Sequence, residues 1–161
     1  MARVVTLRAP RAGDWGWIVS RHGAVYAAEH GWGADYEAFV ARLVGDLVAG
    51  LDPAAEAAWI ADDGGGAVGS VACVRRDART AQLRLLLVEP SARGLGLGSR
   101  LVETCLQFAV GAGYGRIMLW TVTGLDASRR LYEGAGFTLD AEEGAFPYDP
   151  TRTEQIWSRP L

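Results

Sequence analysis

The sequence predicts a protein of the α/β class folded as one domain, and three observations lead to this prediction. The chain has 161 residues, which is enough for one domain with a hydrophobic core and short for two. Half of the residues are hydrophobic and 22% are charged, a composition typical of soluble globular proteins. Segments with helical periodicity alternate with short apolar segments typical of β-strands. We therefore expect a single α/β domain over residues 1–161.

The first third of the chain is expected to contain a short strand and two helices. Residues 4–8 are predicted to form the strand, which Pro10 ends. A helix is predicted from Asp14, a residue type that caps helices, to about residue 30. A second helix, with an uninterrupted apolar stripe, is predicted over residues 35–49. The inward stripe of the first helix includes two polar side chains and consists of Ile18, His22, Val25 and Glu29.

Most strands of the expected sheet lie in the rest of the chain. Residues 57–61 and 68–74 flank the glycine-rich turn at residues 62–66 and are predicted to form a hairpin. The further elements expected, in chain order, are a strand over 81–88, a helix over 96–112, an apolar strand over 116–122, a helix over 126–134 and two strands over 137–139 and 153–158.

Composition and charge exclude several classes of function. The net charge of −3 gives no support for binding to nucleic acid or to a membrane surface. Cys73 and Cys105 are expected to be buried free thiols, as in a reducing compartment. Neither the cysteines nor the two histidines have the spacing of metal ligands, so no metal site is expected. The sequence lacks a signal-peptide core and an apolar run long enough to cross a bilayer, so we expect a cytoplasmic protein.

A glycine-rich loop that contains an arginine joins the strand ending at Val88 to the helix that follows. It reads Glu89-Pro90-Ser91-Ala92-Arg93-Gly94-Leu95-Gly96-Leu97-Gly98. Such a loop presents free backbone N–H groups at the positive end of a helix dipole, an arrangement that binds phosphate groups. A dinucleotide fingerprint is excluded because Ser99 stands where its third glycine belongs, and a P-loop is excluded because the chain contains no lysine.

Two separated motifs resemble those of the GNAT superfamily, the Gcn5-related N-acetyltransferases. Arg93, Gly96 and Gly98 match the pattern Arg-x-x-Gly-x-Gly, and residues 131–137 match the pattern Leu-Tyr-x-x-x-Gly-Phe. The resemblance implies a mixed, largely antiparallel sheet that splays between its fourth and fifth strands, with about four helices. The run over residues 81–96 is also similar to acetyltransferase domains fused to MarR-type regulators, so we expect a stand-alone version of such a domain.

The resemblance implies an enzyme that transfers acetyl from acetyl-CoA to a primary amine, on a small molecule or a peptide, by direct attack in a ternary complex. Tyr132 matches the tyrosine that serves the family as general acid toward the leaving thiolate. Glu29 is our candidate for the general base or for anchoring the substrate. A second copy of the chain is a candidate partner, since dimers are frequent in the superfamily. The residues implied to bind the coenzyme are Leu86, Leu87, Val88, Arg93, Gly94, Leu95, Gly96, Leu97, Gly98 and Ser99.

Two departures from the family pattern leave an alternative function open. The stretch over residues 124–127 lacks the asparagine that often opens the helix before the tyrosine motif. The strand over residues 81–88 lacks the family's frequent glutamate and carries Gln82 and Arg84 nearby. The alternative is an acetyl-CoA-binding sensor or partner module with weak catalysis or none. Residues 142–148, which are aromatic and acidic, are expected to overlie the acceptor cleft.

Overall fold

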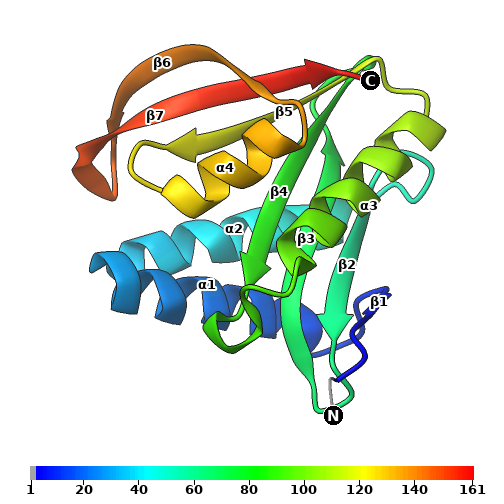
Figure 1. Cartoon of the computed structure of the whole chain (residues 1–161), viewed down its shortest axis with the longest axis horizontal. Coiled ribbons are helices and arrows are strands. Elements are labelled where there is room, and N and C mark those ends of the chain that lie inside the picture. Colours follow the sequence, from blue (N-terminus) through cyan, green and yellow to red (C-terminus); the bar gives the residue numbers. More distant parts are fainter. Residues whose placement is uncertain (1–2) are drawn as a thin grey trace.

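The computed structural model describes residues 3–161 and has a seven-stranded sheet at its centre (Figure 1). The strands are β1 (Thr6–Arg8), β2 (Ala57–Asp62), β3 (Ala67–Arg75), β4 (Thr80–Val88), β5 (Arg116–Val122), β6 (Thr138–Phe146) and β7 (Asp149–Pro160). Their order across the sheet is β1-β2-β3-β4-β5-β7-β6. All neighbours run antiparallel except β4 and β5, which are parallel. The mixed, largely antiparallel sheet is therefore confirmed.

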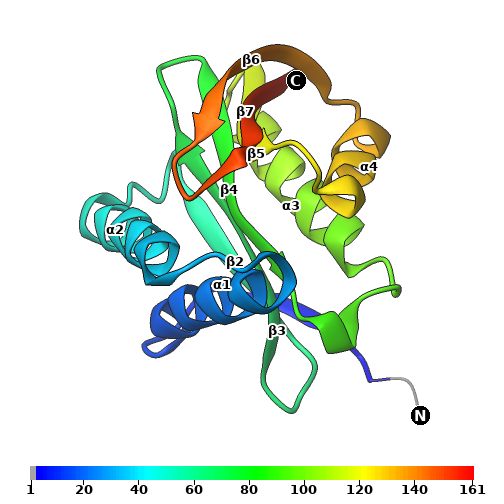
Figure 2. The same cartoon turned by 90° about the vertical axis from the view of Figure 1, so that its left-hand side faces the viewer.

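Four α-helices within residues 3–161 cover the two faces of the sheet, as expected (Figure 2). On one face lie α1 (Asp14–His30) and α2 (Ala34–Gly50). On the other face lie α3 (Leu97–Gly111) and α4 (Asp126–Gly134), with the short 3₁₀ turn η1 (Pro90–Ala92) before α3. None of the helices in this part of the chain is both long and apolar enough to span a membrane.

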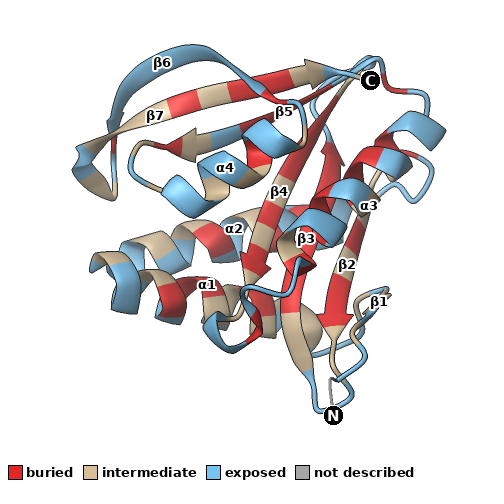
Figure 3. Ribbon diagram, in the orientation of Figure 1, coloured by how far each residue is buried: buried red, intermediate tan, exposed pale blue. Residues whose placement is uncertain are grey.

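Each face of the sheet has its own hydrophobic core. Ile18 of α1 and Val40 of α2 pack on Ile60 of β2, and all three are almost inaccessible to solvent. On the opposite face α3 buries Leu101 and Cys105 against the sheet. Full burial of an aliphatic side chain of this size contributes about 1.5–3 kcal/mol. Figure 3 shows the buried residues concentrated along the central strands. Cys73 and Cys105 are buried and free, as predicted.

The parallel strands β4 and β5 separate along most of their length, which confirms the predicted splay. Within the described residues they pair only through Thr80–Gln82 and Arg116–Met118. Beyond this point the two strands diverge (Figure 1). The backbone edge of residues 83–88 is therefore not hydrogen-bonded to β5 and faces a gap in the middle of the sheet.

The lengths predicted from the sequence for the last two strands are too short. We expected strands over residues 137–139 and 153–158, whereas β6 and β7 form a long hairpin over Thr138–Phe146 and Asp149–Pro160. Every residue of β6 except Phe146 is exposed, because β6 is the edge strand. An exposed edge strand lacks the apolar alternation on which strand prediction depends.

The inward stripe of α1 is correct for three of its four members. Ile18, His22 and Val25 are buried. Glu29, in the last turn, is outside the core, with 32% of its side chain exposed. Gly31 ends the helix in the left-handed conformation, with φ of 72°.

Candidate active site

A β-bulge in β4 shapes the strand edge that faces the gap. Leu85 has a φ of 56°, a conformation that non-glycine residues rarely adopt. Ser70 of β3 pairs with Leu87 and Ala72 pairs with Arg84, so one residue of β3 faces two residues of β4. The Ser70 hydroxyl donates a buried hydrogen bond of 2.7 Å to the Leu85 carbonyl oxygen, which holds the bulge in place.

The loop between β4 and α3 presents its backbone rather than its side chains. Gly94 and Gly96 have φ values of 82° and 74°, which favour glycine. A Cβ atom added at either position would meet no heavy atom within 4 Å. Gly96 precedes α3, and no side chain caps this helix end. The first N–H groups of α3 therefore have no side-chain acceptor and can donate to another one, such as a phosphate oxygen.

The loop lines a cavity of about 400 Å³, which we call the coenzyme cavity. Nine of the ten residues predicted to bind the coenzyme line it: Leu86, Leu87, Val88, Arg93, Gly94, Gly96, Leu97, Gly98 and Ser99. The tenth, Leu95, is not part of the lining and is 76% exposed. The two residues before α4 and its first turn also line the cavity: Gly124, Leu125, Asp126, Ala127 and Ser128.

An ion pair joins the loop to the end of α1 inside the coenzyme cavity. The Arg93 Nη1 atom donates to the Glu29 Oε1 atom at 2.6 Å, and the Arg93 Nε atom donates to the Val88 carbonyl oxygen at 3.3 Å. Both ionic side chains are partly exposed, so the pair by itself contributes little to stability. Its position matters more, because it joins the end of α1 to the loop within the wall of the coenzyme cavity.

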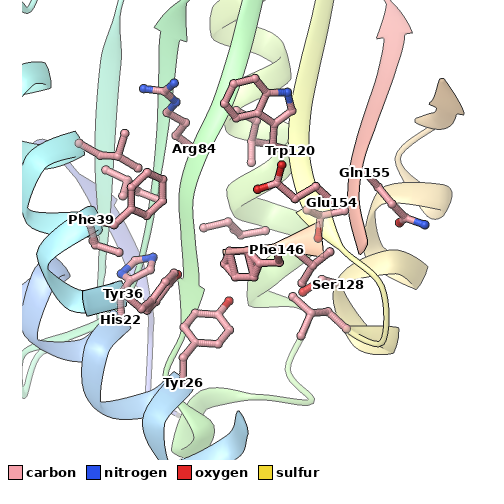
Figure 4. A pocket seen from close by; sticks show the side chains of 18 of the residues that line it. His22, Tyr26, Tyr36, Phe39, Arg84, Trp120, Ser128, Phe146, Glu154 and Gln155 are labelled. Atoms are coloured by element: carbon pink, nitrogen blue, oxygen red, sulfur yellow. The ribbon is translucent and has the colours of Figure 1, made fainter. Parts of the chain in front are cut away.

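A second cavity, of about 260 Å³, lies between α1, α2 and the splayed strands, and we call it the acceptor cavity (Figure 4). Its wall is rich in aromatic side chains: Tyr26, Trp32, Tyr36, Phe39, Trp120, Tyr132 and Phe146. Several of these rings pack on one another, with Tyr26 stacked on Trp32 at a centroid distance of 4.9 Å. Glu143 and Phe146 come from the segment that we expected over the acceptor cleft.

The two cavities meet at a common wall. Tyr26, Leu86, Leu125 and Ser128 line both of them. Tyr132 lines the acceptor cavity, is 7% exposed and packs its ring edge against Phe137. Burial, with smaller effects of Tyr26 and Cys105, raises the pKa of Tyr132. The Tyr132 phenol is therefore protonated at neutral pH and can donate a hydrogen bond.

Comparison with known proteins agrees with this geometry. The family model described as "Acetyltransferase (GNAT) family" matches residues 21–137, which include the loop, Tyr132 and both strands of the gap. The chain belongs to the GNAT acetyltransferase family. This GNAT protein is 33% identical over 88 residues to N-acetylaspartate synthetase of Danio rerio, an alignment that covers 54% of this chain and 31% of that protein. The chain thus spans about a third of the length of the curated relatives it matches.

Solved structures share the fold of this GNAT protein over nearly its whole length. One is yncA of Salmonella typhimurium with its cofactor acetyl-CoA, at a TM-score of 0.77 and 18% identity, covering 98% of this chain and 94% of that one. Another is spermidine N-acetyltransferase of Vibrio cholerae in complex with CoA and spermine, at a TM-score of 0.73 and 20% identity, covering 97% and 95%. At these identities the likeness establishes the fold.

The acceptor cavity of this GNAT protein contains a buried histidine. The Nδ1 atom of His22 lies 2.7 Å from the Ile18 carbonyl oxygen, which can only accept, so we assign the proton to Nδ1. Burial lowers the pKa of His22 to about 4, so the ring is neutral at pH 7. An imidazole with this pKa is a weak base, so we interpret His22 as a hydrogen-bonded core residue.

Sequence reasoning missed most of the acceptor wall. Trp120 and Glu154 face the cavity from β5 and β7, yet on their own they are indistinguishable from ordinary strand residues. The aromatic residues of α1 and α2 show only the periodicity of a core-facing helix. Within residues 3–161, no three His, Cys, Asp or Glu side chains are grouped so that they could hold a metal ion.

Proposed function

We propose that this GNAT protein transfers acetyl from acetyl-CoA to a primary amine by direct attack in a ternary complex. The observation that carries the proposal is the junction of two cavities at Tyr26 and Leu86, with the phosphate-binding loop on one side and an aromatic wall on the other. A reaction between two bound substrates needs such an arrangement, because the reacting atoms must be held close together.

The donor would lie in the coenzyme cavity. Backbone N–H groups of residues 94–99 and the Arg93 guanidinium group would bind the pyrophosphate, because both donate hydrogen bonds and the guanidinium group carries a positive charge. Leu86, Leu87 and Val88 would contact the pantetheine arm along the free edge of β4. A backbone N–H group at the β4 bulge would stabilise the negative charge that develops on the thioester oxygen.

The chemistry conserves atoms and charge without a further reagent. Acetyl-CoA supplies the acetyl group: a bond forms between the amine nitrogen and the carbonyl carbon, and the carbon–sulfur bond breaks. Tyr132 would donate a proton, or a hydrogen bond, to the departing thiolate. The acceptor nitrogen loses one proton, so that the products are an N-acetyl amide and the free thiol of CoA.

Glu29 remains our candidate for the proton acceptor or substrate anchor. Its carboxylate pairs with Arg93. A pyrophosphate group would compete for the same guanidinium group, since bidentate phosphate contacts are among the strongest that arginine makes. Coenzyme binding would thereby release the Glu29 carboxylate at the junction side of α1.

The proposal is tested by measuring free thiol from purified protein given acetyl-CoA and a panel of amines, diamines, aminoglycosides and peptides. We expect thiol release that depends on both substrates. Binding of acetyl-CoA without release from any amine would instead support the alternative, a sensor or partner module. Absence of acetyl-CoA binding would contradict both. The single domain over residues 1–161, the cytoplasmic location, the homodimer and the likeness to MarR-fused domains stay predictions.

A further inference from the structure

Two charged side chains stand out in the wall of the acceptor cavity. Glu154 of β7 pairs with Val122 of β5, so both side chains lie on the face of the sheet that carries α1 and α2. Glu154 is half-buried, and within residues 3–161 no Arg or His lies within salt-bridge distance of it. Figure 4 shows its carboxylate directed into the cavity, beside Trp120 and Phe146.

Arg84 of β4 lies at the end of the acceptor cavity away from Tyr26 (Figure 4). Among the described residues it has no carboxylate within salt-bridge distance. Burial, with a smaller effect of Arg76, lowers the pKa of Arg84, and the more distant Asp46 and Glu56 only partly oppose this. A partly buried guanidinium group without an ionic partner has lost hydration that nothing replaces, so binding an anion to it is energetically favourable.

The order of groups along the cavity gives the acceptor a direction. The amine must reach the junction at Tyr26 and Leu86, where the two cavities meet. In Figure 4 Tyr26 and Arg84 lie at opposite ends of the labelled side chains, and Glu154 lies to the right of both, beside the half-exposed Trp120 ring. An acceptor whose amine lies near the junction can therefore have a carboxylate and an apolar ring beside it and a guanidinium group toward its far end.

The far end of the cavity disfavours a second cation. Arg76 lies over the Trp120 ring, 5.2 Å from its centroid, and adds a second guanidinium group near Arg84. An ammonium group placed there would meet charges of the same sign, which weakens binding, whereas a carboxylate could bind Arg84 through two hydrogen bonds. Glu143, the other carboxylate of the wall, is exposed.

We propose that the acceptor is an ω-amino acid: a primary amine that Glu154 attracts into the cavity as its ammonium form, and whose apolar body leads to a carboxylate bound by Arg84. This inference rests on the proposed function and deepens it by naming the substrate class. Glu154 acts here as a binding group for the amine, and Arg84 determines specificity at the opposite end.

The test uses three acceptors with six-carbon chains that differ only at the far end: ε-aminocaproate, hexylamine and hexamethylenediamine. We measure kcat/KM from thiol release, and acceptor binding to the CoA complex by calorimetry. We expect ε-aminocaproate to exceed hexylamine by about 10- to 100-fold, the range of one charge-assisted contact. Hexamethylenediamine is expected to be the poorest of the three.

Substitutions assign the two ends of the acceptor. Arg84→Gln should abolish the preference for ε-aminocaproate over hexylamine. Arg42→Gln, on the exposed side of α2, makes the same change in net charge and should keep the preference. Glu154→Gln should raise KM for all three acceptors with acetyl-CoA affinity unchanged, and Glu103→Gln on α3 is its matched control.

Two results would overturn the inference and leave the proposed function intact. One is equal use of the three acceptors, or preference for hexamethylenediamine, with thiol released. The other is thiol release from a different amine when none of the three acceptors binds the CoA complex. Failure of the proposed function is recognised separately, because acetyl-CoA would then not bind or no amine would release thiol. Calorimetric binding of the three acceptors decides the inference even if turnover is absent.

Discussion

The two cavities that meet at Tyr26 and Leu86 are built from different parts of the polypeptide. The coenzyme cavity depends mainly on one continuous stretch, residues 86–99, and on its backbone N–H groups. The acceptor cavity draws side chains from α1, α2, β4, β5, β6, β7 and α4, which are far apart in the sequence. Backbone N–H groups suit one kind of ligand group, phosphate, and do not depend on the side chains of the loop. In the acceptor cavity each side chain can be replaced separately, which changes the ligand that the cavity fits. The comparison suggests that the donor site is general and that the acceptor site carries specificity.

The largest expected effect is at Tyr132, in the wall of the acceptor cavity. Tyr132→Phe removes the hydroxyl group proposed to protonate the thiolate, and kcat should fall about 10²- to 10⁴-fold, the usual contribution of general acid catalysis. Calorimetry should find acetyl-CoA affinity unchanged. Tyr114→Phe is the matched control, because the Tyr114 hydroxyl donates to the Ala55 carbonyl oxygen, outside both cavities. Equal losses of activity in the two variants would contradict the role of Tyr132.

Glu29→Gln distinguishes a base from a residue that only pairs with Arg93. If Glu29 accepts the proton, the variant should lose about 10²-fold in kcat/KM and the acidic limb of its pH profile. If the ion pair is its whole contribution, acetyl-CoA should bind at least as tightly as in wild type, because Arg93 is freed, and the pH profile should not change. The steady-state pH profile and acetyl-CoA calorimetry, measured together, separate the two results.

The acceptor cavity should also be the more acid-sensitive of the two, because its wall contains buried, neutral His22. Its pKa is lowered to about 4 in the folded protein, against about 6.5 when unfolded, so the unfolded state binds more protons below pH 6.5. The contribution of His22 to the free energy of unfolding is therefore fully present above pH 6.5. It is lost as the pH falls toward 4, and the loss is about 3 kcal/mol at most.

Denaturant unfolding of wild type and His22→Gln at pH 7.5 and pH 4.5 checks this prediction. Glutamine keeps an N–H donor for the Ile18 carbonyl oxygen but does not titrate. The carboxylates lower the stability of both proteins at acid pH. The free energy of unfolding lost between pH 7.5 and pH 4.5 should therefore be larger in wild type than in His22→Gln, and the difference is the contribution of His22. Equal pH dependence in the two proteins would show that the histidine is not held neutral.

The smallest effect is expected at the turn of the loop. Gly96→Ala places a side chain at φ of 74°, where no neighbour would clash, so only backbone strain of about 1–2 kcal/mol is expected. Acetyl-CoA affinity should fall about tenfold if the loop shifts to relieve the strain. Gly45→Ala, in open space on α2, should instead raise stability by up to about 1 kcal/mol. Unchanged coenzyme affinity in Gly96→Ala would mean that the loop can bind the coenzyme without this backbone conformation at residue 96.

The same difference between the cavities explains what the sequence could predict. Glycines at positive φ, an arginine and a following helix are neighbours in the chain, so the loop that we propose binds phosphate is visible as a local motif. The β-bulge at Leu85, held by Ser70 from another strand, has no local signal because it depends on the pairing of β3 and β4. Glu154 and Arg84 belong to one cavity only through the fold.

The account's central claim is that donor and acceptor bind in two cavities that join at Tyr26 and Leu86. The most direct test is the affinity of a bisubstrate compound, CoA joined through its sulfur and a carbonylmethyl bridge to the amine of ε-aminocaproate. Occupying both cavities at once should make it bind about 10²- to 10⁴-fold more tightly than CoA, and Arg84→Gln should remove part of this gain while CoA affinity stays constant. Binding of the bisubstrate compound no tighter than that of CoA would contradict the claim.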